Sequence, residues 1–390
     1  MQMMKMIRFI PTRCSVSFTV VLCLLSPALV FSAVTANAQK HSTEATVKTS
    51  PFGVLDDGTS VDAFTLTNAH GARAKITNYG ATLTELWIPD RAGKLDDVVL
   101  GYDNVKSYIH GDTWFGATVG PVANRIAHGE FTIDGKTYHT EVNNGPNTLH
   151  SGSIGLSHVV WSAHSVEVHG AAAVRFNYTS KDGEWGFPGN IEFEVTYTLT
   201  DTNELKIQYS AKTDKTTAVN LTNHSYFNLD GGSDVLNYKL TLYASHYTPV
   251  DAGLIPTGEV LPVIGTALDF AKPVVIGDRI GELPTTRGYD HNFVADDQSK
   301  KLKHIAHVLA PKNGRVMDVW TTEPGVQLYT GNFLNGSLTG KRGVVYGQHA
   351  ALCLETQHYP DSVHHANFPS TLLHPGEKYT SETVYRFSIQ

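Results

Sequence analysis

The sequence predicts an all-β fold, a large antiparallel β-sandwich with few short helices. Residues 191–200 alternate apolar and polar side chains with a period of two, which gives a strand one face for the core and one for water. Residues 205–209 repeat the alternation after the turn residues 201–204, so the two segments are expected to form a hairpin. Many such short strands, separated by Gly and Asn/Asp turns, are typical of a sandwich or barrel.

Other stretches extend this pattern along the chain. Residues 174–178, 238–243 and 384–389 alternate in the same way, whereas helical patterns are scarce and the best of them covers residues 300–308. No linker rich in Pro, Gly or Ser, no low-complexity tract and no internal repeat divides the sequence. Roughly 350 residues suffice to bury a large core, so we expect a single domain over residues 39–390.

The first 38 residues have the composition of a secretory signal peptide. Basic residues precede an apolar stretch over residues 15–31, and residues 36–38 read Ala-Asn-Ala, which is a cleavage signal. A membrane anchor is the alternative, but the apolar stretch is short for a span and Pro27 interrupts it. We therefore expect residues 1–38 to be cleaved, the mature chain to begin near Gln39, and the protein to be exported to the periplasm or secreted.

The cysteine count indicates that the fold is stabilised by its core and not by disulfides. Cys14 and Cys23 leave with the signal peptide, and only Cys353 remains in the mature chain. No internal disulfide is then possible, so the fold must be held together by its buried apolar residues.

Composition and motifs exclude several classes of partner. The net charge of −7 becomes about −10 once the three basic residues of the signal peptide are removed, which argues against binding to nucleic acid or to an anionic membrane. The 19 His residues do not form the helical His pair with Glu of zinc hydrolases, and a Cys cluster is absent. A Gly-rich phosphate loop and a G-x-S-x-G elbow are absent too, so we expect no metal and no cofactor.

The run NLTNHSYFNL, residues 220–229, is the stretch around which the chain is organised. It places six polar side chains within ten residues, and buried polar groups cost free energy unless they are paired. One interpretation is a half-buried strand in which His224 is satisfied by a neighbour. The other is the floor of a pocket in which His224 donates a proton.

Two further stretches carry polar residues that an ordinary strand or loop does not need. Asn124 and Arg125 lie between apolar residues, and Arg offers a planar fork of donors for hydroxyl or carboxylate oxygens, although a structural salt bridge is equally compatible. The turn-rich loop over residues 143–152 delivers His150, which is either a binding group or a surface side chain.

Two more stretches combine polar and aromatic residues. Trp185 and Phe187 are expected to be exposed by their Gly and Pro neighbours, where aromatic faces suit the C–H surfaces of sugars, unless they serve loop packing. Asp290 precedes His291 between aromatic residues, and it can orient the imidazole, hold substrate hydroxyls or form a turn.

Glu355 follows the four apolar residues 351–354, which are typical of a buried strand. A carboxyl group at the end of such a strand has its pKa raised by desolvation and becomes a usable general base. A solvated acid at the strand end is the alternative.

These clusters together resemble the galactose mutarotase (aldose 1-epimerase) family, whose fold is a large antiparallel β-sandwich. The resemblance covers nearly the whole mature chain and rests on seven motifs in family order: ANRI (123–126), NTLHSG (147–152), NLTNHSYFNL (220–229), LIPTGE (254–259), GYDHNF (288–293), GVQLYTGNF (325–333) and CLETQHYPDS (353–362).

The resemblance implies a function and a set of roles. The expected reaction interconverts the α and β anomers of free aldohexoses such as galactose and glucose by acid/base ring opening and closure, in a monomer or homodimer. His224 is the implied general acid, Glu355 the general base, and His150 assists near the ring oxygen. The sugar hydroxyls are bound by Asn124, Arg125, Asp290 and Gln327.

Departures from the family pattern concern sugar preference and not the chemistry. Pro121 stands where many members have Arg, Ser151 replaces a frequent Gly, and Trp185 is bulky. Two other classes stay open as alternatives. One is a sugar-binding protein on the same fold, which has no need for both His224 and Glu355. The other is a glycoside hydrolase, which normally uses two carboxylates where this chain offers Glu and His, or an epimerase of phosphorylated sugars, which should show extra Arg or Lys residues near its pocket.

Overall fold

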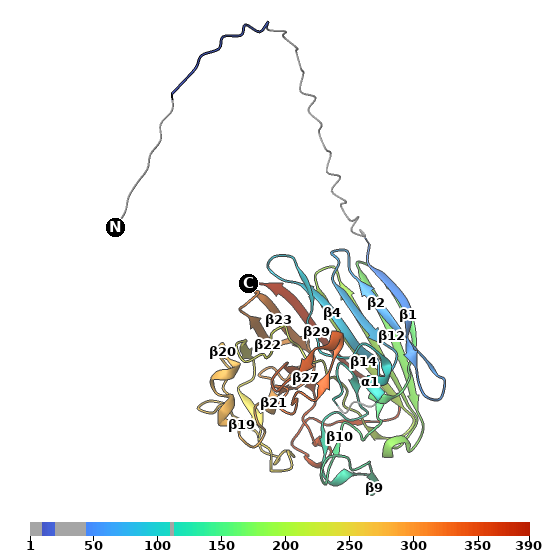
Figure 1. Cartoon of the computed structure of the whole chain (residues 1–390). Helices are drawn as coiled ribbons and strands as arrows, with labels where there is room; N and C mark the ends of the chain where they lie inside the picture. The colour runs from blue at the N-terminus through green and yellow to red at the C-terminus, as the bar shows by residue number, and fades with distance from the viewer. Residues whose placement is uncertain (1–9, 20–43, 110–112) are drawn as a thin grey trace. The chain divides into compact units, whose positions relative to one another are not determined.

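A nine-stranded antiparallel sheet is the largest element of the computed structural model, which describes residues 10–19, 44–109 and 113–390 (Figure 1). The strands follow the order β11-β12-β13-β14-β29-β23-β22-β17-β20. Their bounds are β11 Ser162–Val168, β12 Ala171–Ser180, β13 Ile191–Thr200, β14 Glu204–Thr213, β17 Lys239–Leu242, β20 Val274–Val275, β22 Lys303–Ala310, β23 Arg315–Thr321 and β29 Tyr379–Ile389.

A five-stranded sheet from the start of the described fold packs against this sheet. Its strands β1 and β2 contact β12, as Figure 1 shows, and Phe64 meets Phe176 edge to face across the interface at 5.7 Å. Packing two sheets face to face buries the apolar side of each, which confirms the predicted sandwich. The bounds are β1 Thr46–Val54, β2 Ser60–Thr67, β3 Arg73–Thr77, β4 Thr82–Pro89 and β5 Leu95–Asp97.

A second five-stranded sheet runs in the order β19-β18-β21-β24-β27 and carries Asp290, Gln327 and Glu355. All its pairings are antiparallel. Its strands are β18 His246–Thr248, β19 Leu261–Pro262, β21 Asp290–Val294, β24 Gly325–Tyr329 and β27 Cys353–Gln357.

Short strands and single turns complete the fold, and α1 Val105–Ile109 is the α-helix of the described residues. The short strands are β6 Thr118–Val119, β7 Arg125–Ile126, β8 Glu130–Ile133, β9 Lys136–His139, β10 Thr148–Leu149, β15 Thr217–Ala218, β16 Thr222–Asn223, β25 Leu338–Thr339, β26 Val345–Tyr346 and β28 Leu372–Leu373. The 3₁₀ turns are η1 Ala127–Gly129, η2 Leu156–His158, η3 Glu184–Gly186, η4 Ile276–Asp278, η5 Ile280–Glu282, η6 Lys341–Gly343 and η7 Ser362–His364.

The hairpin expected from the period-two pattern is present as β13 and β14. Tyr197 lies opposite Ile207, and the turn occupies residues 201–203. The apolar positions of both strands are buried. Local alternation was therefore a sufficient guide to this pair of strands.

The helix expected over residues 300–308 is wrong, because these residues enter β22. A β-bulge between His304 and Ala306 places Ile305 and Ala306 both in the core and interrupts the alternation. Residues 303 and 306, and residues 305 and 308, are then buried three positions apart, as in a helix, although residues 303–310 all belong to a strand.

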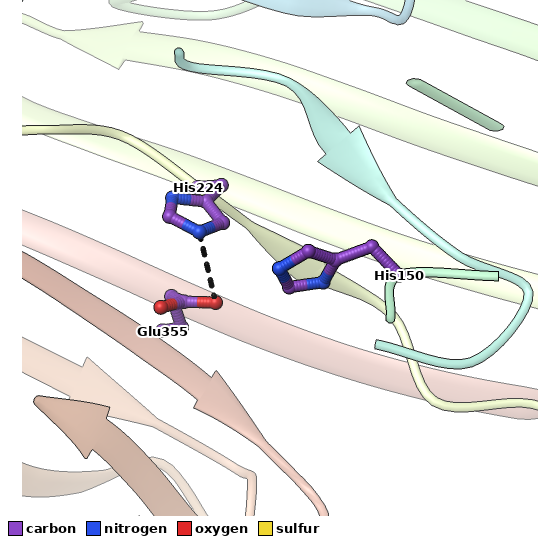
Figure 2. A group of neighbouring side chains, drawn as sticks. All are labelled: His150, His224 and Glu355. Atoms are coloured by element: carbon purple, nitrogen blue, oxygen red, sulfur yellow. Dashed lines mark ion pairs between the residues drawn. The ribbon is translucent and has the colours of Figure 1, made fainter. Parts of the chain in front are cut away.

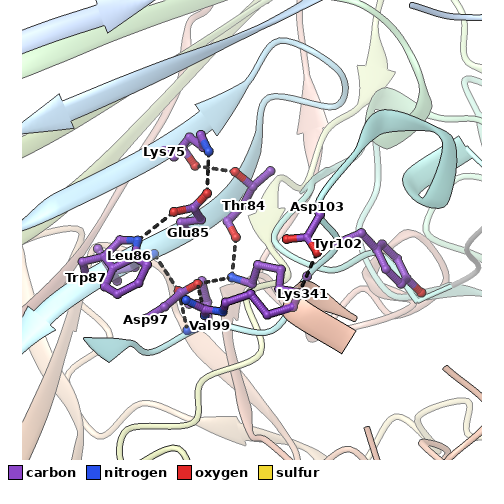
Figure 3. A network of polar contacts seen from close by, with 12 residues as sticks. Lys75, Thr84, Glu85, Leu86, Trp87, Asp97, Val99, Tyr102, Asp103 and Lys341 are labelled. Atoms are coloured by element: carbon purple, nitrogen blue, oxygen red, sulfur yellow. Dashed lines mark hydrogen bonds and ion pairs between the residues drawn. The ribbon is translucent and has the colours of Figure 1, made fainter. Parts of the chain in front are cut away.

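A buried ion pair joins the turn η6 to strands β4 and β5 of the five-stranded sheet β1–β5 (Figure 3). Nζ of Lys341 lies 2.6 Å from Oδ2 of Asp97 and donates a hydrogen bond of the same length to the carbonyl oxygen of Thr84. Arg342 reaches the same carboxylate at 3.2 Å. Asp97 is almost fully buried, so its charge is stabilised by these two cations.

Of the predicted signal peptide, residues 1–9 and 20–38 lie outside the described residues, and residues 10–19 contain no helix or strand. Residues 41–390 form one compact unit. Among the described residues, no helix has the length and apolar character needed to cross a membrane.

Candidate active site

Glu355 is the central residue of β27. It lies opposite Gln327 of β24, which in turn lies opposite Asn292 of β21, so the three side chains project from one face of the sheet. Only 2% of Glu355 is exposed. The position at a strand end and the alternative of a solvated acid are therefore both wrong, because Thr356 and Gln357 continue the strand beyond it.

His224 lies in an irregular segment, residues 220–229, that is buried along its whole length. Only β16 within this segment is strand, so the half-buried strand is not what forms here. The N–H of His224 donates to the carbonyl oxygen of Ala117 at 3.0 Å, and its own carbonyl accepts from the N–H of Gly116 at 2.9 Å. The segment is a buried floor, and these two bonds fix the imidazole above it.

His150 follows β10 and is buried, which excludes the surface side chain that the sequence left open. Its backbone adopts a left-handed conformation, with φ of 55°. Its ring nitrogen Nδ1 accepts a hydrogen bond of 3.2 Å from the backbone N–H of Asn124, so Nε2 carries the hydrogen of the neutral ring. His150 therefore presents a donor at Nε2.

The three side chains meet although they come from distant parts of the sequence. Figure 2 shows His224 above Glu355 with His150 beside them; Nε2 of His224 lies 3.7 Å from Oε2 of Glu355, and the two imidazole rings are 5.2 Å apart. One nitrogen or oxygen from each of the three residues lies within 4.8 Å of the others. A metal ion also fits this spacing, so the expected absence of a metal stays a prediction.

Burial shifts the pKa of Glu355 and the pKa values of the two histidines in opposite directions. Desolvation raises the pKa of Glu355 well above its usual value; the nearby charge of Asp290 raises it further and that of Arg125 opposes the rise. Desolvation lowers the pKa of His224 to about 4 and that of His150 well below its usual value. The pKa of Glu355 then lies above that of His224, the reverse of their ordinary order, so the proton of the pair resides on Glu355 until a bound molecule changes the balance.

Arg125 begins β7 and is buried, with its Nε donating to Oδ1 of Asn144 at 3.1 Å. In the described part of the chain it forms no ion pair with a carboxylate, so the structural salt bridge considered for it is not found. Its charge acts on the neighbouring Glu355 instead. Asn124 is buried beside it, in a left-handed conformation, and its backbone carbonyl accepts from the N–H of His150.

Asp290 and Gln327 form a second polar pair of the site. Nε2 of Gln327 donates to Oδ1 of Asp290 at 2.6 Å. Asp290 is the first residue of β21, so it is neither a turn residue nor a partner for the ring of His291, whose Nδ1 accepts only the backbone N–H of Asp290. The carboxylate is held by Gln327, which leaves it able to accept hydroxyl groups.

An aromatic shell that the sequence did not reveal surrounds the two imidazoles. Tyr226 stacks on His224 with ring centres 5.0 Å apart, and Tyr329 meets the same ring edge-on at 6.3 Å. Trp114 lies 4.6 Å from the ring of His150 and runs nearly parallel to that of His224 at 6.5 Å. Tyr226 and Tyr329 lie within the quoted motifs but read as ordinary strand aromatics, and Trp114 carried no local signal.

The loop over residues 182–189 serves packing. Phe187 is buried and stacks on Phe131 at 5.5 Å, so the expected exposure of Phe187 is wrong. Trp185 stacks on Tyr178 of β12 at 5.8 Å. The loop is tight because a Cβ at Gly186 would approach the carbonyl oxygen of His139 to 1.9 Å, and this contact draws the aromatic side chains inward.

Several buried polar atoms of the site have no hydrogen-bond partner among the described residues: Nδ1 of His224, Oε2 of Glu355, Oε1 of Gln327, Oδ1 of Asn292 and Nε1 of Trp114. Buried polar atoms are normally paired, because leaving one unpaired costs about 1–3 kcal/mol. Donors and acceptors are mixed in this set. Such a set matches a small molecule rich in hydroxyl groups, which both donate and accept.

A β-sandwich that brings together a buried acid/base pair and a mixed set of donors and acceptors without hydrogen-bond partners defines an enzyme that moves protons on a small polar substrate. The comparisons with known proteins narrow this class. The family model for aldose 1-epimerase matches residues 62–386. The chain belongs to the aldose 1-epimerase family.

Individual relatives agree with the family match. Galactose mutarotase of mouse is 47% identical over 341 residues, covering 87% of this chain and 97% of that protein. The human galactose mutarotase is 45% identical over 349 residues, with 88% and 99% covered. Aldose 1-epimerase of Escherichia coli K12 is 38% identical over 338 residues, with 85% and 96% covered.

Solved structures confirm the fold. The aldose epimerase homologue of C. elegans superposes with a TM-score of 0.78 at 30% identity, covering 88% of this chain and 99% of that one. Galactose 1-epimerase of Lactobacillus acidophilus has the same TM-score at 27% identity, with 89% and 99% covered. The expected class of enzyme, an isomerase that acts as an aldose 1-epimerase, is thereby confirmed.

Proposed function

We propose that the protein interconverts the α and β anomers of free galactose and glucose, with Glu355 as the base at the anomeric hydroxyl and His224 as the acid at the ring oxygen. The observation that carries this assignment is the contact between Nε2 of His224 and Oε2 of Glu355, two buried groups 3.7 Å apart. Both oxygens of the reaction are attached to C1 of the sugar, so two adjacent groups of opposite function can serve them together.

The proton balance uses these two groups alone. The carboxylate of Glu355 takes the proton of O1, the C1–O1 bond becomes a carbonyl, the C1–O5 bond breaks, and the imidazolium of His224 protonates O5. The open-chain aldehyde then rotates about C1–C2. Closure on the other face of C1 reverses both transfers, because Glu355 returns its proton to O1 and His224 recovers the proton of O5.

The shifted pKa values fit the two halves of this cycle. Burial favours a protonated Glu355 and a neutral His224, which is the state that the pair reaches after ring opening. The ionised pair needed for the cyclic sugar contains the same number of protons. Arg125 and the hydroxyls of a bound sugar favour the ionised carboxylate. Ring opening makes two transfers, from O1 to Glu355 and from His224 to O5, whose net result is that one proton passes from His224 to Glu355, and ring closure reverses both.

The remaining site residues would bind and orient the sugar. The hydrogen at Nε2 of His150 is available near the ring oxygen, because Nδ1 already accepts from Asn124. Arg125, Asn124, Asp290 and Gln327 supply donors and acceptors for the hydroxyls. All seven residues come from one chain, so either a monomer or a homodimer would be active.

Polarimetry on freshly dissolved α-galactose and α-glucose tests the proposal. The wild type should accelerate the approach to equilibrium over the buffer blank, and Glu355→Gln should not, while still binding sugar. Acceleration by the folded Glu355→Gln protein at the wild-type rate would remove the role of Glu355. The two sugars would also establish the substrate preference.

We further propose that the enzyme acts after export, where it would equilibrate anomers before sugar uptake. The support is the composition of residues 1–38. N-terminal sequencing of the protein purified from its native cell should begin at Gln39. An unprocessed chain in the cytoplasm would contradict this location.

A further inference from the structure

The segment that carries Trp114 is rigidly held although the indole itself is partly exposed. Phe115 is buried and makes edge contacts with Tyr226 at 4.7 Å and Tyr346 at 5.5 Å. The N–H of Gly116 donates to the carbonyl oxygen of His224, and a Cβ at Gly116 would approach the carbonyl oxygen of Leu83 to 2.0 Å. The backbone next to Trp114 is thus tied directly to His224.

This anchoring fixes the indole against both imidazoles of the site. Its ring lies 4.6 Å from that of His150 at an angle of 60°, and 6.5 Å from that of His224 at 21°. Tyr226 stacks on His224 with an angle of 16°, but only 4% of this residue is exposed. Trp114 differs from Tyr226 because part of its side chain is accessible, and it carries an N–H that can donate a hydrogen bond.

The indole N–H is the second observation that points to a ligand. Nε1 of Trp114 is buried and has no acceptor among the described residues. The indole N–H of the core residue Trp161 donates to the carbonyl oxygen of Leu156 at 3.1 Å, and that of Trp87 to Glu85 at 2.7 Å. Nε1 of Trp320 also lacks an acceptor among the described residues, but Trp320 stacks on His304, whereas Trp114 lies against the two histidines of the site. An N–H without an acceptor costs free energy unless a ligand supplies one.

We propose that Trp114 is a further substrate-contacting residue, which donates a hydrogen bond from Nε1 to a hydroxyl group of the bound aldose and covers the sugar from the side of the two histidines. The inference rests on the proposed function, since it assigns an additional contact to the same site. It makes Trp114 a determinant of sugar preference, because only an aldose with a hydroxyl at the right carbon can accept the bond.

Trp114→Phe tests the contact, with Trp185→Phe as the matched control. Both tryptophans are partly exposed loop residues with φ of 52°, but Trp185 packs on Tyr178. Loss of one neutral hydrogen bond should raise KM for galactose about fivefold in Trp114→Phe with kcat nearly unchanged. Trp185→Phe should leave both constants as in the wild type. A KM for Trp114→Phe equal to that of the control overturns the proposal.

Monodeoxygalactoses identify the hydroxyl and exclude a merely structural effect. Removal of the accepting hydroxyl should weaken binding to the wild type but should not weaken binding to Trp114→Phe any further. Each of the other deoxy sugars should lose the same amount of affinity for both proteins. A loss that is the same in both proteins for every sugar overturns the contact. Because Phe retains most of the ring, thermal melts of the two variants should show that both remain folded.

Equilibrium binding separates this inference from the proposed activity. Galactose should change the tryptophan emission of the wild type and of Trp185→Phe, and the change should be lost in Trp114→Phe. Polarimetric activity without such a change would overturn only the role of Trp114. A change in emission without activity would support the contact and overturn the mutarotase assignment.

Discussion

Gln327 lies directly opposite Glu355 on neighbouring strands, but its amide nitrogen donates to Oδ1 of Asp290 at 2.6 Å and not to Glu355. Oε2 of Glu355 has no donor among the described residues, and Nε2 of His224 approaches it only to 3.7 Å. A buried carboxylate without such bonds is unstable, so the pKa of Glu355 stays high in the free enzyme. The arrangement preserves a basic oxygen for the substrate.

Replacement of Glu355 by Gln should separate activity from stability. Turnover should fall by about 10²–10⁴-fold, the usual contribution of a positioned base. The free energy of unfolding at pH 7 should rise instead, by about 1 kcal/mol or more, because ionisation of Glu355 opposes burial at any pH above its unfolded pKa. Polarimetry and urea unfolding measure the two effects, and a less stable variant at pH 7 would contradict the burial argument.

The pH dependence of kcat/KM should follow the proton count of the Glu355–His224 pair. The active forms hold one shared proton, so activity should be lost as pH falls through about 4, where His224 becomes protonated beside a protonated Glu355. It should also be lost as pH rises through the raised pKa of Glu355. Polarimetric rates corrected for the spontaneous reaction check both limbs, and an acid limb near 6.5 would contradict the lowered pKa of His224.

Arg125 should act through its charge and its shape, and two substitutions distinguish these. Arg125→Leu removes the positive charge that lowers the pKa of Glu355, so the alkaline limb of kcat/KM should move to higher pH. Arg125→Lys keeps the charge but loses the planar fork, so KM should rise while the limb stays near its wild-type position. An identical alkaline limb in both variants would show that Arg125 exerts no electrostatic effect on the base.

The buried ion pair of Lys341 and Asp97 predicts a large and asymmetric effect on stability. Lys341→Met should cost about 3–5 kcal/mol, because it removes the cation closest to a buried carboxylate. Lys94→Met is the matched control, since Lys94 pairs with Asp96 but its side chain is 72% exposed; it should cost less than about 1 kcal/mol. Denaturant unfolding of both variants provides the comparison, and equal losses would contradict the role of burial.

The sequence was most informative where one residue type stood out against its neighbours. A His within a polar run and a Glu after an apolar strand made His224 and Glu355 candidates, and the family resemblance implied their roles. Local patterns could not predict that the two residues meet across 131 positions, because this depends on how β27 and the segment over residues 220–229 are placed.

The helix expected over residues 300–308, the expected exposure of Phe187 and the missed Trp114 all reflect tertiary contacts that local sequence patterns do not contain. The bulge at His304 changed the spacing of buried residues in β22 and imitated a helix. Phe187 was expected to be exposed because its neighbours are Gly and Pro, yet the close approach of Gly186 to His139 turns it inward. Trp114 was missed because its contacts with the histidines are entirely tertiary. Local patterns report the path of a strand, but not what covers each of its faces.

The buried Cys353 gives the strand of Glu355 a chemical reporter. In a chain that begins at Gln39 it is the sole thiol, and it lies two residues before the base on the same strand. Its side chain is inaccessible and burial raises its pKa well above the usual range, so a thiol reagent can modify it only when β27 opens. The labelling rate therefore measures how often β27 opens, and we expect bound sugar to lower it.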